Sequence, residues 1–449
     1  MNKLPAKPDA SGRRLLLAIL ILCLVIRIGI AVHERHRPLV SDAAMYSQIA
    51  DSLINGHGFS VHFSCFAPGE LRSTAHRDPL YIFFLAAVKM VCGPNVLFIL
   101  ILQALMSTAT CYLVYLSASR FARHRLVPPL AAVLFTLYLP VALSVGQVLT
   151  ETLAVFLVAA AVYAFAIGMR YGPLVCVGAG VLFGLAILTR GSLLFMPVLL
   201  ALLMLRMRAE IAAWLPKAAA FVAVSYLVVA PWTIRNYVVM HGFVPVSAYG
   251  WQILWAGTGP ADGHILAYSG APVETGPVNH HDPHKPYVSK ATYDYITALQ
   301  EAGRRLSEVQ AESLFRKEAF RQIEQHPLRY VSLMPTKFVR LWGNVLFENP
   351  PSKLSIALAL GNLVILVLAA IGCVKGGVDR MFRGASMLLV GYITCIGIFI
   401  FACVRFTYAL MPMLLILAAV GIVSLVGGKP GAAEVAEPRT PAASKKRMA

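Results

Sequence analysis

The chain has 449 residues, of which 58% are hydrophobic and only 13% are charged, and its formal net charge is +18. Soluble domains carry about 25% charged residues, so this composition excludes a disordered chain, a nucleic-acid-binding domain and an ordinary soluble enzyme. Long apolar runs indicate an integral membrane protein with basic loops instead. The eight cysteines form neither a CxxC pattern nor a disulfide framework.

Ten apolar segments come close to the length of about 20 residues that a membrane-spanning helix needs. In chain order they are 15–33, 95–118, 126–144, 149–168, 173–190, 192–206, 214–232, 354–374, 384–403 and 407–427. A further run, 79–92, is shorter, carries Lys89 and begins with Pro79, so we predict an interfacial helix there. We interpret 15–33 as an anchor, because it is longer than a signal-peptide core and lacks a small-x-small cleavage site.

The Lys and Arg residues of the short loops indicate the orientation. If segment 1–14 is cytoplasmic, the other basic stretches fall on the same side: 120–125, 206–217, 375–383 and the tail. This agreement holds only if 79–92 does not span the membrane. We therefore predict that both termini are cytoplasmic.

The predicted topology divides the chain into five parts: a cytoplasmic segment 1–14, a transmembrane module 15–232 with a first external loop 34–78, an external loop domain 233–353, C-terminal transmembrane helices 354–427 and a disordered cytoplasmic tail 428–449. In the external domain a Gly- and Pro-rich section, 242–286, precedes a helical one. Ser307 and Gln310 resemble a capping box, and the helix should end at His326-Pro327. There is no strong internal repeat, which counts against many secondary transporters.

Charged side chains beside membrane spans are costly and therefore indicate function. Five fall at the outer face in this topology: Asp42, Glu151, Arg190, Arg235 and Arg405. Asp42 opens SDAAMYSQIADSLINGHGF, where it or Ser41 can cap a helix, and Tyr46 shares its face at i, i+4. Asp42 is either only a cap or a catalytic base, because a helix start keeps a carboxylate ionised.

The other four charged positions also have two interpretations each. Glu151, in GQVLTETLAVF, either compensates a helix dipole or is a second carboxylate that orients an acceptor or shares a metal. Arg190, Arg235 and Arg405 either snorkel to lipid headgroups or play a structural part, or bind phosphate oxygens. Arg77 flanks the same surface.

Other motifs give little support for a different chemistry. The HHDPH string at 280–284 has no second cluster with ligand spacing, so a solvated loop is favoured over a metal site. No P-loop, Rossmann or GxSxG pattern is present, which leaves nucleotide use and serine hydrolysis without support.

Seven blocks in order resemble the GT-C membrane glycosyltransferases, with the bacterial protein-mannosyltransferase and aminoarabinose-transferase-like group nearest. After the single anchor they are SDAAMYSQIADSLINGHGF, HRDPLYIFFLAAVKMVCG, VLTETLAVFL, GLAILTRGSLLFMP, APWTIRNYVVMHGFVPVS and VRFTYALMPMLLILAAVGI. The resemblance covers roughly 13–425. It implies an all-α polytopic GT-C fold with about 10 transmembrane helices, interfacial helices and a small external α or α+β domain.

The resemblance also implies an activity. The chain would be a hexosyl or pentosyl transferase of the bacterial inner (plasma) membrane, taking sugar from a polyprenyl-phosphate donor at the external (periplasmic) face. Asp42 matches the family's essential acid of the first external loop, Glu151 a second acid and Arg190 a basic contact to the lipid phosphate. Arg77 resembles a further basic position, although here Asp78 follows it. The acceptor, whether protein, lipid A, cell-wall polymer or O-antigen, is not indicated.

The expected mechanism is an inverting displacement. Asp42 would deprotonate the acceptor hydroxyl, and Tyr46 would help to hold acceptor and sugar in line. Arg190, with Arg235 or Arg405, would stabilise the departing phosphate. A divalent metal that bridges phosphate and carboxylates stays open, although two acids are few for a dedicated site.

Two other classes of function compete with this interpretation. A transporter or flippase of lipid-linked sugars would also need basic groups, but would favour ionisable residues near the middle of the membrane. A structural or assembly protein would not bring its polar side chains together. Asp42, Glu151 and Arg190 far apart in the structure would therefore favour the structural class.

Overall fold

The computed structural model describes residues 10–62, 71–171, 173–207, 211–258, 307–343 and 353–427. These residues are mostly helical, with two short antiparallel strands, β1 (Ser60–Val61) and β2 (Arg72–Ser73), so the all-α prediction is confirmed. Several sequence features lie outside the described residues: Cys65, most of 242–286, the HHDPH string at 280–284 and the tail 428–449.

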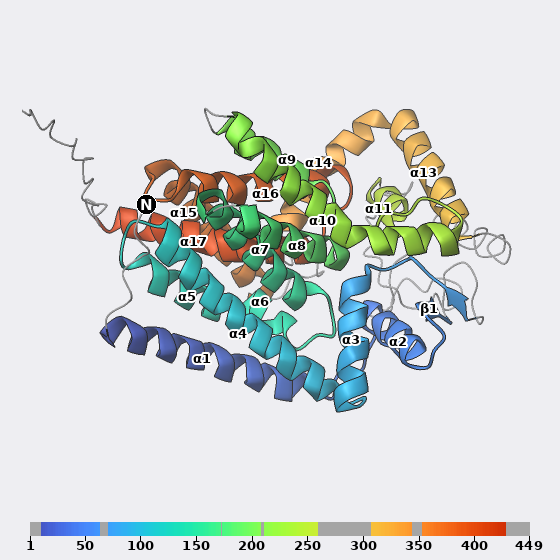
Figure 1. Ribbon diagram of the computed structural model, residues 1–449, viewed down its shortest axis with the longest axis horizontal. Coiled ribbons are helices and arrows are strands. Elements are labelled where there is room, and N and C mark those ends of the chain that lie inside the picture. Colours follow the sequence, from blue (N-terminus) through green and yellow to red (C-terminus); the bar gives the residue numbers. More distant parts are fainter. Residues whose placement is uncertain are drawn as a thin grey trace, which may run out of the picture.

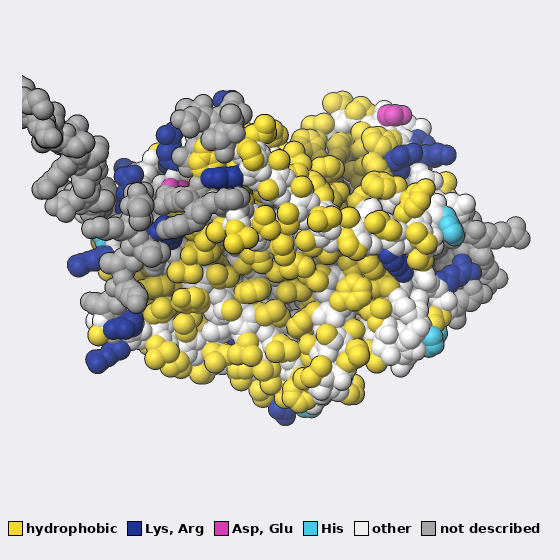
Figure 2. Space-filling view, viewed as in Figure 1, with side chains coloured by type: hydrophobic (Ala, Val, Ile, Leu, Met, Phe, Trp, Pro, Cys, Tyr) yellow, Lys and Arg dark blue, Asp and Glu magenta, His cyan; other side chains and the backbone are white. Residues whose placement is uncertain are grey.

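Within the described residues, seven of the ten predicted spans form helices that are long and apolar enough to cross a membrane. They are α1 (Ala10–Glu34), α4 (Val96–Phe121), α7 (Glu151–Tyr171), α10 (Ile211–Met240), α15 (Lys353–Lys375), α16 (Arg380–Phe399) and the continuous pair η2 (Val404–Leu410) and α17 (Met411–Leu425). The other three contain shorter apolar helices: α5 (Val127–Leu137), α8 (Pro173–Thr189) and α9 (Met196–Arg206). The chain is therefore a multi-pass membrane protein, and Figure 2 shows apolar side chains over the middle of one face.

The helices that are not predicted spans lie together at one end of the bundle of long helices (Figure 1). They are α2 (Asp42–Ile54), α3 (Pro79–Cys92), α11 (Gly250–Gly257) and α13 (Glu308–Gln325), with α14 (Pro327–Trp342) next to them. α3 begins and ends at the predicted residues and runs across the direction of the long helices (Figure 1). Such a course fits the predicted interfacial helix.

Two of the basic loops that we assign to the cytoplasmic side touch each other. Ala122 and Val378 form a bridge, and the Arg123 N–H donates to the Gly377 carbonyl. The loops after α4 and α15 therefore lie on one side of the bundle, as the charge pattern requires. Which side of the membrane this is stays a prediction.

The predicted span 126–144 is broken at Tyr138 into α5 and α6 (Leu139–Ser144). The break is stabilised by the buried Arg27 of α1, whose guanidinium donates to the carbonyls of Thr136 (3.0 Å) and Phe135 (3.2 Å). Carbonyls at a helix end need partners where water is absent. The sequence analysis did not single out Arg27, because one charge within a long apolar run does not reveal its partner.

α10 continues past the point where the sequence analysis ends it. The predicted segment ends at 232, just after Pro231, but α10 runs through Pro231 to Met240. Proline removes one helical hydrogen bond, yet the turns beyond it are held from outside. Trp232 Nε1 and Asn236 Nδ2 donate to the Val246 carbonyl at 2.7 and 3.1 Å. The predicted end at 232 is therefore wrong.

α15 and α17 pack closely through two glycines. A methyl group on Gly372 would overlap the carbonyl oxygen of Leu417, and one on Gly421 would overlap that of Leu368. Small residues of this kind allow helix backbones to approach each other in membranes.

We expect Gly372→Ala to lower the thermal stability of the purified protein in detergent, because the added methyl must push α17 away. Overpacking of this kind costs about 1–3 kcal/mol. Gly361→Ala in the same helix is the matched control, since its methyl would meet nothing within 4 Å. Equal melting temperatures for the two variants would contradict this close contact.

Candidate active site

A cavity of about 470 Å³ lies among α2, α7, α11, α16 and η2. Six of the seven site residues expected from the sequence line it: Asp42, Tyr46, Arg77, Glu151, Arg190 and Arg405. Apolar side chains supply much of the remaining wall: Leu194, Phe195, Ile253, Ile396, Ile400, Phe401 and Phe406. The cavity therefore combines charged and apolar surfaces.

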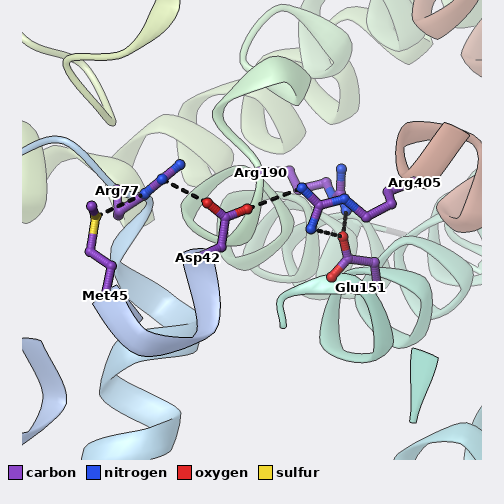
Figure 3. A network of polar contacts seen from close by, with 6 residues as sticks. All are labelled: Asp42, Met45, Arg77, Glu151, Arg190 and Arg405. Carbon is purple, nitrogen blue, oxygen red and sulfur yellow. Dashed lines mark hydrogen bonds and ion pairs between the residues drawn. The ribbon is translucent and has the colours of Figure 1, made fainter. Parts of the chain in front are cut away.

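Asp42 is held between two arginines (Figure 3). Arg77 Nη2 donates to Asp42 Oδ1 at 2.7 Å, and Arg405 Nη2 donates to Oδ2 at 3.0 Å. Asp42 is the first residue of α2, but no side-chain capping bond is formed by Ser41, and the Asp42 carboxylate turns to the guanidinium groups. Burial favours the protonated form, but the two arginines outweigh it and hold the pKa of Asp42 below its ordinary value. Asp42 is therefore ionised at neutral pH.

Glu151 is the second carboxylate of the cluster and the first residue of α7. Its Oε1 accepts from Arg190 Nη2 at 3.1 Å and lies 3.4 Å from Arg405 Nη1. Arg405 thus contacts both carboxylates (Figure 3). Within the described residues, Glu151 Oε2 and Arg190 Nε are buried and have no hydrogen-bond partner. The cluster therefore keeps one acceptor and one donor unused.

Aromatic rings support two of the guanidinium groups. The Cζ atom of Arg77 lies 4.8 Å from the ring centre of Tyr249 and 5.8 Å from that of Tyr46, and Arg190 lies 5.5 Å from that of Phe406. Such contacts orient a cation without neutralising it. Burial, with Asp42 nearby, raises the pKa of Tyr46 well above its usual range, so Tyr46 stays neutral.

Asp78, which the sequence analysis noted only as a neighbour of Arg77, has a separate role. Its Oδ2 accepts from the Gly191 N–H at 3.2 Å and its Oδ1 from Ser247 Oγ at 2.8 Å. Burial raises the pKa of Asp78. Asp78 thus joins the start of α3 to the residue after Arg190, and its presence beside Arg77 does not keep Arg77 from Asp42.

The structure does not bring Arg235 to the cavity. Its Nη1 donates to the Thr74 carbonyl at 2.7 Å and its Nη2 to the Phe59 carbonyl at 3.2 Å, and its guanidinium lies 4.9 Å from the Trp232 ring centre. The continuation of α10 past Pro231 is the physical reason, because it places Arg235 on a helix that braces the first external loop. We therefore remove Arg235 from the predicted site.

Two glutamates of α13 hold segments that line the cavity. Glu308 accepts from Thr74 Oγ1 (2.5 Å) and the Ala75 N–H (2.7 Å), next to Arg77. Glu312 accepts from the first N–H groups of α11, at Trp251 (2.8 Å) and Gln252 (3.2 Å). The predicted capping box at Ser307 and Gln310 is confirmed, and so is the helix end before Pro327.

The donor atoms of the cavity suit an anion better than a metal ion. Among the described residues, no three His, Cys, Asp or Glu side chains are grouped closely enough to hold a metal. Both oxygens of Asp42 and of Asp78 already accept hydrogen bonds. The three guanidinium groups supply the positive charge that a metal would otherwise bring.

Comparison with known proteins bears on the fold. No protein-family model and no curated protein sequence matches the chain. Among solved structures, it is similar to the Archaeoglobus fulgidus oligosaccharyltransferase tethered with an acceptor peptide, with a TM-score of 0.53 and 13% identity over 92% of this chain and 49% of that one. ArnT from Cupriavidus metallidurans bound to undecaprenyl phosphate has a TM-score of 0.40 and 12% identity over 91% of this chain and 78% of that one.

The chain spans about half the length of the oligosaccharyltransferase. At this level of identity the likeness shows a shared fold with the oligosaccharyltransferase, and the all-α polytopic fold expected from the sequence is confirmed.

The burial of Glu312 makes stability depend on pH. Burial raises the pKa of Glu312 to about 7, so the folded protein binds this proton more tightly than the unfolded chain does. The resulting stabilisation is complete below the unfolded pKa and falls as the pH rises toward about 7. We expect the melting temperature of the wild type to fall more than that of Glu312→Gln between about pH 5 and pH 8. This is roughly the window that spans the pKa of Glu312 in the folded protein and in the unfolded chain. A parallel pH dependence in both proteins would contradict this assignment.

Proposed function

We propose that this protein is a glycosyltransferase that moves a sugar from a polyprenyl-phosphate donor to an acceptor at the external face of the inner membrane. The main support for this proposal is that Asp42, Glu151 and three arginines lie in one cavity beside an apolar wall. A polyprenyl phosphate has the same two parts, an anionic phosphate and a long apolar chain. The shared fold with a solved oligosaccharyltransferase supports this class of reaction.

The phosphate would lie against the guanidinium groups. Arg190 is well suited, because its buried Nε has no partner within the described residues and its neighbours Glu151 and Phe406 fix the guanidinium plane. Arg77 and Arg405 can share their donors between Asp42 and a phosphate, since each has several N–H groups. The lipid chain would then follow the apolar wall along Ile396 and Ile400.

Asp42 is the proposed base. The acceptor oxygen attacks the anomeric carbon, its proton passes to Asp42, and the bond from that carbon to the phosphate oxygen breaks with inversion. Paired with two arginines, Asp42 is a weak base. When the donor phosphate takes part of the contact with Arg77 and Arg405, the pKa of Asp42 rises, so donor binding prepares the carboxylate to accept a proton.

Glu151 would hold Arg190 and Arg405 in place, and Tyr46 would form a neutral wall beside Asp42. The acceptor would enter from the external domain 233–353, which includes α11, α13 and α14. Both termini would be cytoplasmic. A transporter of lipid-linked sugars is the alternative, but the cluster is built at helix ends, where Asp42 begins α2, Glu151 begins α7 and Arg190 follows α8. Transport favours ionisable groups near mid-membrane instead.

We expect Asp42→Asn to lower transfer by at least about 10²–10³-fold, because an amide cannot accept the proton. A deletion strain should accumulate the sugar-linked polyprenyl phosphate and lose one glycan modification, as read by mass spectrometry. Complementation by the wild type should reverse both changes, and Asp42→Asn should reverse neither.

Asp51→Asn is the matched control for this experiment. Asp51 lies in the same helix, but it pairs with Lys89 and does not line the cavity, so this variant should complement fully. Full complementation by Asp42→Asn would remove Asp42 from the proposed role. An unchanged lipid and glycan profile in the deletion strain would overturn the proposed function itself.

We expect Arg190→Gln to weaken the binding of undecaprenyl phosphate by about 10–100-fold, the size of one or two charge-assisted hydrogen bonds. Binding is measured on the purified protein by native mass spectrometry or calorimetry. Arg206→Gln is the control, because Arg206 is exposed in the last turn of α9. Equal affinities in the two variants would exclude Arg190 as a phosphate ligand.

A further inference from the structure

One buried amide oxygen in the cavity wall lacks a hydrogen-bond partner within the described residues. Gln252 of α11 lines the cavity and is only 6% exposed, and its Oε1 has no hydrogen-bond partner within the described residues. Buried polar atoms in folded proteins are nearly always hydrogen-bonded, because an unpaired one costs free energy. An unpaired amide oxygen in a cavity wall therefore indicates a group that a ligand brings.

Five neighbouring polar side chains of the cavity already have other partners. Ser247 Oγ donates to Asp78, and Tyr392 OH donates to the Ser192 carbonyl. Arg77, Arg190 and Arg405 contact the two carboxylates Asp42 and Glu151. Their donors are committed within the protein or face the proposed phosphate.

The backbone that carries Gln252 is held in place. Gln252 lies at the start of α11, where its backbone N–H and that of Trp251 donate to Glu312. α11 packs on α13 through Trp255, whose ring centre is 5.2 Å from that of Phe315. A polar group presented from a packed helix is preorganised for binding, and such positions determine specificity.

The unpaired atom of Gln252, its amide oxygen Oε1, determines which chemical group can be its partner. An amide oxygen accepts a hydrogen bond, so its partner must carry an O–H or N–H group. A polyprenyl phosphate diester offers phosphate oxygens and an apolar chain, and neither donates a hydrogen bond. The sugar of the donor carries hydroxyl groups, and these are the donors that the bound lipid would bring to this wall.

We propose that Gln252 is a specificity-determining residue that accepts a hydrogen bond from a hydroxyl or amino group of the transferred sugar. This inference rests on the proposed function, because it requires that the cavity binds a sugar-linked lipid. A site built around such a bond rejects sugars that lack the donor group, since the amide oxygen would then stay unpaired.

The test compares lipids with and without the sugar. The full-length protein in nanodiscs is titrated with undecaprenyl phosphate and with its glucose, mannose and aminoarabinose derivatives. We expect at least one derivative to bind the wild type about ten-fold more tightly than the bare lipid, which is the scale of one hydrogen bond. Gln252→Met, which keeps the length of the side chain, should remove this advantage and leave the affinity for undecaprenyl phosphate unchanged.

Gln48→Met is the control, because Gln48 lies on α2 outside the cavity. This variant should keep the full preference for the sugar-linked lipid. Unchanged binding of the bare lipid by Gln252→Met also shows that the variant is folded.

Three results would overturn the proposal: an equal loss for bare and sugar-linked lipid, a preference that survives Gln252→Met, or no added affinity from any of the sugars. Failure of the wild type to bind undecaprenyl phosphate at all would reject the proposed function and this inference together. If the wild type binds the bare lipid but one of these three results is found, the inference about Gln252 alone is rejected.

Discussion

The double contact of Arg405 with Asp42 and Glu151 is the interaction on which the site depends. The three residues come from the first external loop, the start of α7 and the turn before α17, so the contact fixes segments that are far apart in the sequence. Charged groups in such surroundings are stable only when they are paired. Asp42 gains a second arginine from the loop before α3, and Glu151 gains one from the loop after α8. The requirement for pairing therefore gathers the loops of one end of the bundle around a single cavity.

Much of this arrangement can be predicted from the sequence, and the reasons are local. Apolar length locates the spans, Pro79 marks the start of α3, and the Ser307 pattern marks the start of α13. Asp42, Glu151 and Arg190 stand out because charge is rare beside apolar runs. The roles that could not be predicted are those of side chains whose partners are distant in the sequence. Arg235 looks like Arg190 in sequence, but α10 continues past Pro231, and Arg235 turns to the carbonyls of Thr74 and Phe59 instead.

α13 shows how the external region and the cavity are connected. Glu308 and Glu312 lie one helical turn apart, so they face the same way, yet they hold different segments, the loop before Arg77 and the start of α11. A movement of α13 would therefore shift a guanidinium and the wall that carries Gln252 together. Periodicity predicts this helix, but its two carboxylates resemble an ordinary solvated face until the neighbouring backbone is in view.

The numbers of arginines and carboxylates in the cluster have a consequence for the end of the reaction. Three guanidinium groups against two carboxylates leave one positive charge, which matches the single negative charge of a phosphodiester donor. Under the proposed function, Asp42 takes up a proton while the leaving lipid becomes a phosphomonoester, which carries about −1.5 to −2 charge at pH 7. The five side chains of the cluster then carry a charge of +2, so they remain balanced with the product as they were with the substrate. The spent lipid would consequently leave slowly until Asp42 returns its proton to the solvent, and the turnover rate would follow the exchange of that proton.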